Sequence, residues 1–60
     1  MGYRIQVFQS DDNKLLDLAS NVPLADTRED AVEAITMLKA EYALILDTDG
    51  QLIDRLKRSA

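Results

Sequence analysis

One segment of the chain carries the apolar spacing of an amphipathic helix. Apolar side chains follow one another there at intervals of four, three and four residues: Ala31, Ile35, Leu38 and Tyr42. This spacing places them on one face and predicts a helix from about Arg28 to Glu41. Thr27 is predicted as its N-cap, because Asp30 three residues later can complete a capping box. The remaining segments must therefore be arranged around a single helix.

The segments before this helix predict a β-hairpin. Residues 3–9, YRIQVFQ, alternate apolar and polar side chains, which is typical of a half-buried strand. The next residues, SDDN, favour a turn, because short polar side chains bond to nearby backbone. Residues 14–19, KLLDLA, then return as the second strand. Asp11 and Asp12 are interpreted as turn residues rather than a catalytic pair, because a loop tip offers no burial to separate their pKa values.

The motif DTDG at residues 47–50 is open to two interpretations, a calcium loop or a hairpin turn. An EF-hand loop needs acidic residues at its first, third and fifth positions, glycine at its sixth and glutamate at its twelfth. With Gly50 at the sixth position, the first is Ile45 and the twelfth is Leu56, which argues against calcium. A hairpin turn with Gly50 in the left-handed conformation fits better.

This hairpin interpretation also predicts the pairing of the last two strands. A three-residue loop pairs Leu46 with Leu52 and Ile45 with Ile53. The two strands would then cover residues 43–47 and 51–56.

The element order predicts one domain over residues 1–60. Two antiparallel hairpins joined through a helix most simply form a four-stranded antiparallel sheet with the helix on one face, an α+β fold of ββαββ type. The order of the two hairpins in the sheet stays open. The strand residues expected beneath the helix are Tyr3, Ile5, Val7, Leu16, Leu18, Leu44, Leu46 and Leu52.

The small size of the chain makes self-association an attractive source of stability. A domain of 60 residues buries only a small core, and such domains are usually reinforced by disulfides, metals or a partner subunit. The chain has no cysteine and no histidine, so disulfides and the commonest metal ligands are excluded. We expect no metal and no cofactor, and we expect a homodimer.

Three apolar residues are candidates for the dimer contact. In the predicted register Ile45 and Ile53 are cross-strand neighbours facing away from the helix, and Phe8 joins them. This face is either an interface between two copies or an ordinary exposed surface. The shortage of core favours the interface.

The charge balance argues against nucleic acid and membrane partners. Seven basic and eleven acidic residues give a net charge of -4, which disfavours binding to phosphates. No apolar run approaches the ~20 residues of a membrane span, and the N-terminus lacks the apolar core of a signal peptide. We expect a cytoplasmic protein.

Two charged clusters could bind a protein partner. One is basic and lies near the C-terminus: Arg55, Lys57 and Arg58. The other is acidic and lies at the start of the helix: Asp26, Glu29, Asp30 and Glu33. Helix capping and a solvated helix face explain the acidic cluster without a partner, and a solubilising tail that protects an edge strand explains the basic one; these explanations are favoured over partner binding.

These observations favour a non-enzymatic protein-interaction module. The chain lacks histidine, cysteine and a glycine-rich phosphate loop, so no common catalytic pattern is present. The alternative is a small acidic inhibitor from a phage or mobile element, which mimics nucleic acid or blocks a basic groove. It would need a continuous acidic surface from Asp26 through Glu33 to Asp47 and Asp49, and salt would weaken its binding.

The second half of the chain resembles a known type of domain. The helix start DTREDAVEAI, the apolar strand, the Asp-Gly turn and GQLIDR are similar to small uncharacterised bacterial domains of strand-strand-helix-strand-strand type. The resemblance covers about Asp26 to Arg55. It implies the same fold and brings no activity with it.

Overall fold

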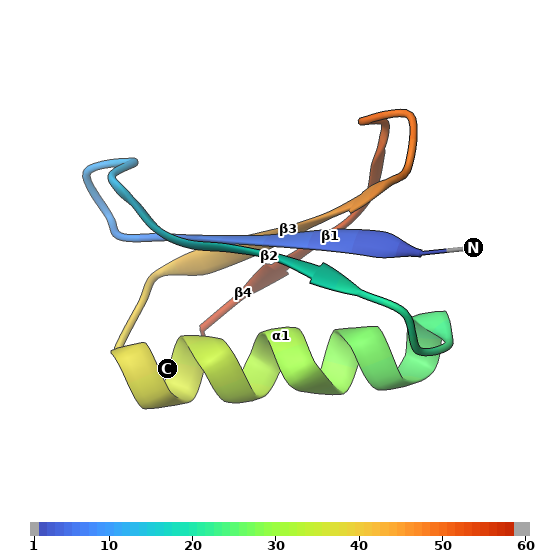
Figure 1. Ribbon diagram of the computed structural model, residues 1–60. Helices are drawn as coiled ribbons and strands as arrows, with labels where there is room; N and C mark the ends of the chain where they lie inside the picture. The colour runs from blue at the N-terminus through green and yellow to red at the C-terminus, as the bar shows by residue number, and fades with distance from the viewer. Residues whose placement is uncertain (1, 59–60) are drawn as a thin grey trace.

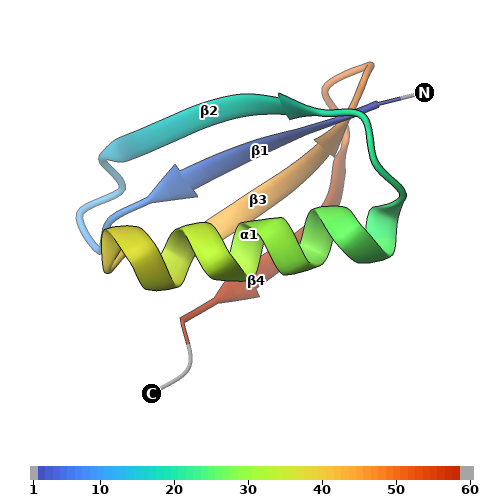
Figure 2. The same ribbon diagram turned by 60° about the horizontal axis from the view of Figure 1, so that its bottom comes forward.

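The computed structural model describes residues 2–58 and has the element order ββαββ (Figure 1). Its elements are β1 (Tyr3–Phe8), β2 (Lys14–Ser20), α1 (Leu24–Leu38), β3 (Tyr42–Asp47) and β4 (Leu52–Lys57). The strands form one antiparallel sheet in the order β2-β1-β3-β4, and α1 packs on one face of it (Figure 2). The predicted ββαββ fold is confirmed, and the sheet places β1 and β3 at its centre.

The core lies between α1 and the two central strands. Its buried apolar side chains are Ile5, Val7, Ala31, Ile35, Ala40, Ala43 and Ile45. The alanines allow the helix to approach the sheet closely, because their side chains occupy little space between the two layers. Tyr3 and Leu16 pack against this core, so the predicted inner face of β1 and β2 is confirmed for these residues.

The predicted inner face of β3 is wrong. Ile45 is fully buried, with 0% of its surface exposed, and Ala43 is buried with it. Because side chains alternate along a strand, Leu44 and Leu46 face away from the helix. Because alternate residues of a strand face opposite sides, an error of one residue in choosing those that face α1 exchanges the two faces of the strand. The expectation that Ile45 contacts a second copy is therefore also wrong.

A β-bulge in β4 explains the misplaced leucine of that strand. Leu46 pairs with Leu52 as predicted, but Ile45 pairs with Asp54 instead of Ile53. Ile53 is thus the extra residue of a bulge, and the strand changes faces across it. Leu52 consequently lies opposite Leu46 on the outer side of the sheet. Beyond the bulge, Asp54 and Leu56 lie opposite Ile45 and Ala43 on the side of α1.

The helix begins one turn earlier and ends three residues earlier than predicted, and Tyr42 belongs to β3 instead of the apolar stripe of the helix. Its N-cap position is Pro23, and Thr27 lies inside the helix with 0% of its surface exposed. The Thr27 hydroxyl donates to the Val22 carbonyl over 3.2 Å and lies 3.1 Å from the Ser20 hydroxyl. The predicted N-cap and capping box are therefore wrong, because Thr27 joins the helix to the end of β2 instead.

The DTDG motif forms the predicted hairpin turn. Gly50 has a φ of 83°, in the left-handed region where glycine carries no steric penalty. The Asp47 carboxylate accepts the backbone N–H groups of Asp49 and Gln51 over 2.8 and 2.9 Å. Within residues 2–58, no three metal-ligating side chains come together as a metal site would require.

Candidate functional site

The face of the sheet opposite α1 has no second layer over it within residues 2–58 (Figure 1). We call it the outer face. The register places the following side chains on it: Arg4, Gln6, Phe8, Lys14, Asp17, Ala19, Tyr42, Leu44, Leu46, Leu52, Arg55 and Lys57. Its apolar centre comes from β3 and β4, where Leu52 has 58% of its surface exposed. An uncovered apolar sheet face is a candidate docking surface.

Two aromatic rings lie at one end of the outer face. The rings of Phe8 and Tyr42 stack with their centroids 5.0 Å apart, and the Arg55 guanidinium lies 4.9 Å from the centre of the Tyr42 ring. The Tyr42 hydroxyl donates to Asp12 Oδ1 over 2.6 Å, and this carboxylate raises the pKa of Tyr42 above its ordinary value of 10.0. These contacts tie the loop between β1 and β2 to β3.

Asp17 pairs with two basic side chains near β2. Asp17 accepts hydrogen bonds from Arg4 over 2.6 Å, from Lys14 over 3.1 Å and from Gln6 over 3.3 Å. The hydrogen bonds from Arg4 and Lys14 lower the pKa of Asp17 below its ordinary value of 3.8. The three charges together leave one positive charge at this end of the outer face.

The lowered pKa of Asp17 makes the stability of the fold depend on pH in the acidic range. Because the folded state lowers its pKa, the contribution of Asp17 to stability is complete above pH 3.8 and is lost as the pH falls through the lower folded value. Asp17→Asn should lower the melting temperature at neutral pH, and the difference from wild type should vanish in strong acid. Thermal melts followed by circular dichroism measure this. Glu29→Gln is the control, and an equal loss at all pH values would contradict the assignment.

Two of the three predicted self-association residues remain at the surface. Phe8 lies on the outer face, and Ile53 is 40% exposed at the bulge. Sequence reasoning missed the apolar residues of β3 on this face. The signal that could have found them is Ala43, whose small side chain suits the face that α1 covers and so leaves Tyr42, Leu44 and Leu46 on the other face.

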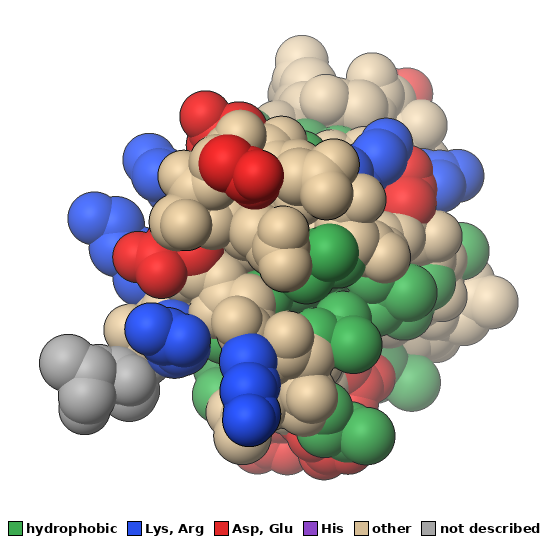
Figure 3. Space-filling model, turned by 90° about the vertical axis from the view of Figure 1, so that its left-hand side faces the viewer, with side chains coloured by type: hydrophobic (Ala, Val, Ile, Leu, Met, Phe, Trp, Pro, Cys, Tyr) green, Lys and Arg blue, Asp and Glu red, His purple; other side chains and the backbone are tan. Residues whose placement is uncertain are grey.

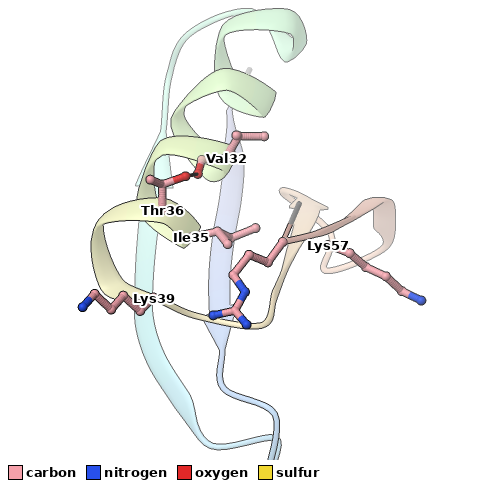
Figure 4. Close-up of a pocket in the computed structure, with 6 residues that line it drawn as sticks. Val32, Ile35, Thr36, Lys39 and Lys57 are labelled. Carbon is pink, nitrogen blue, oxygen red and sulfur yellow. Dashed lines mark hydrogen bonds between the residues drawn. The ribbon is translucent and has the colours of Figure 1, made fainter. Parts of the chain in front are cut away.

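The predicted basic patch does not form a single anion site. Lys57 and Arg58 line a cavity of about 250 Å3 with Lys39, beside Val32, Ile35 and Thr36 of α1 (Figure 4). The side chains of Lys39 and Lys57 extend in opposite directions, so their ammonium groups do not converge (Figure 4). Arg55 is turned to the aromatic rings of the outer face.

The predicted acidic residues divide between two sides of the molecule. Asp26, Glu29, Asp30 and Glu33 lie on α1, where Asp30 and Glu33 line a groove beside β2. Asp47 and Asp49 belong to the turn between β3 and β4, which rises on the side of the sheet opposite α1 (Figure 1). The sheet therefore separates the two acidic groups.

Comparisons with known proteins identify no relative. No protein-family model, no curated protein and no solved structure matches the chain. Among the described residues, no helix has the length and the apolar character that a membrane span requires. The functional assignment therefore rests on the surfaces of this chain.

Proposed function

We propose that this chain is a non-enzymatic protein-interaction module that forms a homodimer through its outer face. The observation that supports the proposal is the uncovered apolar centre of this face, formed by Leu44, Leu46 and Leu52 beside the Phe8–Tyr42 pair. A second copy packing face to face would remove these side chains from water, as the two layers of a β-sandwich do.

The size of the outer face suits a modest dimer. Four strands ~4.8 Å apart, each of about six residues at ~3.4 Å per residue, form a face of roughly 400 Å2. Two such faces in contact would bury roughly 800–1,000 Å2, close to the lower limit of specific interfaces. We therefore expect a dimer that dissociates on dilution, and whose formation adds to the stability of the fold.

Leu52→Asp tests this proposal directly. A carboxylate at this position would lose its hydration in the interface, whereas the monomer already exposes the side chain. In light scattering over a dilution series, the wild-type mass should approach twice 6.7 kDa, and the variant should stay near 6.7 kDa.

Val32→Asp is the matched control for this measurement. Val32 is 50% exposed on α1, on the other side of the molecule, so its variant should keep the dimer mass. A wild-type protein that stays monomeric at every concentration would contradict the proposal, and so would a Leu52→Asp variant that dimerises like wild type.

The alternative proposal is a small acidic inhibitor of a basic protein groove. Its support is that the helix acids Asp26, Glu29, Asp30 and Glu33 form no ion pair with another described residue. Binding of this kind weakens steeply with added salt, whereas packing of the apolar outer face does not. A salt series in the light-scattering and partner-binding measurements distinguishes the two proposals.

A further inference from the structure

The two edge strands of the sheet are covered to different degrees. α1 packs mainly on β3, β1 and β4, so β2 extends beyond it (Figure 2). Leu18 of β2 pairs with Ile5 of β1, and both belong to the inner side of the sheet. Ile5 is nevertheless 1% exposed and Leu18 is 37% exposed. The inner side of β2 is therefore uncovered at Leu18, between Leu16, which packs against the core, and the buried Ser20.

A groove of about 240 Å3 runs between β2 and α1. It is lined by Ile5, Leu18, Asp30, Glu33, Ala34 and Met37. Met37 is 74% exposed, although it is a large apolar side chain. Figure 3 shows hydrophobic side chains gathered on the right-hand side of this end of the molecule, with acidic side chains along the lower edge. The groove thus has an apolar floor and an acidic rim.

The edge of β2 is also less protected against strand pairing than the edge of β4. Edge strands carry unpaired backbone N–H and C=O groups, and charged side chains discourage other strands from pairing with them. β4 carries Asp54, Arg55 and Lys57. β2 carries two charges, Lys14 and Asp17, and these two are bonded to each other, with Asp17 also bonded to Arg4.

We propose that β2 and this groove bind an extended segment of another protein as a fifth strand of the sheet. The side chains of the segment that face α1 would include Arg or Lys on both sides of an apolar residue. Their aliphatic stems would cover Leu18 and Met37, and their charged ends would reach Asp30 and Glu33. The inference rests on the proposed role as a protein-interaction module and not on self-association, because the outer face lies on the other side of the sheet.

A second copy of the chain fits this edge poorly. Antiparallel pairing of β2 with β2 of another copy places both helices on the same side of the sheet, where the two sets of Asp30 and Glu33 repel each other. Pairing of β2 with β4 of another copy is head-to-tail and leads to an open filament, which the charges on β4 oppose. A basic segment from a different protein meets neither obstacle.

A peptide titration tests the inference. The probe is the peptide Thr-Arg-Thr-Val-Thr-Arg-Thr, in which the two Arg residues and Val lie on one face of an extended strand. The control peptide has Glu in place of both Arg residues. Added to the 15N-labelled protein, the basic peptide should shift the amide signals of residues 14–20 and 30–37. The acidic control should shift neither group. The double variant Asp30→Asn/Glu33→Gln should weaken binding about tenfold, because two partly exposed ion pairs are lost.

Methylation of peptide nitrogens shows whether the segment pairs as a strand. An added strand directs alternate N–H groups toward its neighbour. Methylation of one alternate set should therefore abolish binding, whereas methylation of the other set should leave it unchanged. This arm uses the wild-type protein, so it does not depend on the folding of a variant.

The outcomes separate this inference from self-association. Peptide binding by Leu52→Asp with the wild-type affinity supports a site distinct from the dimer contact. Signal shifts on the outer face, equal binding of the acidic peptide, or equal effects of the two methylation sets would overturn the inference. A wild-type dimer that binds no peptide would overturn it and leave self-association standing. A wild-type monomer that binds the peptide as described would support it and remove self-association.

Discussion

Ile45→Ala is expected to destabilise the fold by about 2–5 kcal/mol, the usual range for truncating a buried Ile or Leu. Ile45 is fully buried and pairs with Ile5, which is also buried. Ala at this position would leave a cavity between the sheet and α1. A domain of 60 residues has a total stability of roughly 3–9 kcal/mol, so the variant should lose much of it. Urea denaturation followed by circular dichroism measures the loss.

Leu44→Ala provides the matched control for this prediction. Leu44 is the neighbouring residue on the same strand, but it faces the outer side and is only partly buried. We expect a smaller loss than for Ile45→Ala, because Leu44 keeps part of its surface in water and its truncation leaves no closed cavity beneath α1. Both variants are measured at high dilution, so that dimer formation does not contribute. Equal losses, or a larger loss for Leu44→Ala, would contradict the observed orientation of β3.

For Thr27→Val we expect a loss of about 1–3 kcal/mol, the cost of leaving buried polar groups unpaired. Val has nearly the shape of Thr, so packing is preserved and the hydroxyl alone is removed. Because the Thr27 hydroxyl donates to the Val22 carbonyl, the Ser20 hydroxyl is the donor toward Thr27. Ser20 is only 7% exposed, so its hydroxyl cannot bond freely to water in the variant. The midpoint of urea denaturation reports the change.

A double-mutant cycle isolates this hydrogen bond. Ser20→Ala together with Thr27→Val should cost less than the sum of the single changes, since no hydroxyl is then left unpaired. Additive losses would contradict the bond. Thr27→Ser separates the buried role from an N-cap role. An N-cap accepts Ser as readily as Thr, whereas a buried Thr27 loses a packed methyl group and about 1 kcal/mol.

Local sequence patterns determined the elements themselves. The apolar stripe of Ala31 and Ile35 specified a helix, because its spacing matches 3.6 residues per turn. The alternation of Ile5 and Val7 specified both the strand and the inner face of β1. Gly50 specified the last turn, since its left-handed conformation strongly favours glycine. Each of these signals depends only on residues close together in the chain.

For the candidate site, these patterns identified Phe8 and the acids of α1, but not the outer face of β3. Residues 42–46, YALIL, are apolar throughout, so alternation alone does not show which side is buried. Two small residues favour the observed side, Ala40 before the strand and Ala43 within it, because small side chains let α1 approach the sheet closely.

The tertiary structure alone decided the remaining features. The bulge at Ile53 follows from pairing β4 with β3, and the early start of α1 places Thr27 inside the helix, where it bonds to Ser20. The order of the hairpins and the uncovered edge of β2 depend on where the helix rests on the sheet. The bulge, the order of the hairpins and the uncovered edge arise from contacts between segments distant in the chain, whereas the bond between Thr27 and Ser20 crosses the short connection before α1. The sequence therefore determined which elements form, and long-range packing decided which of their faces remain free to bind.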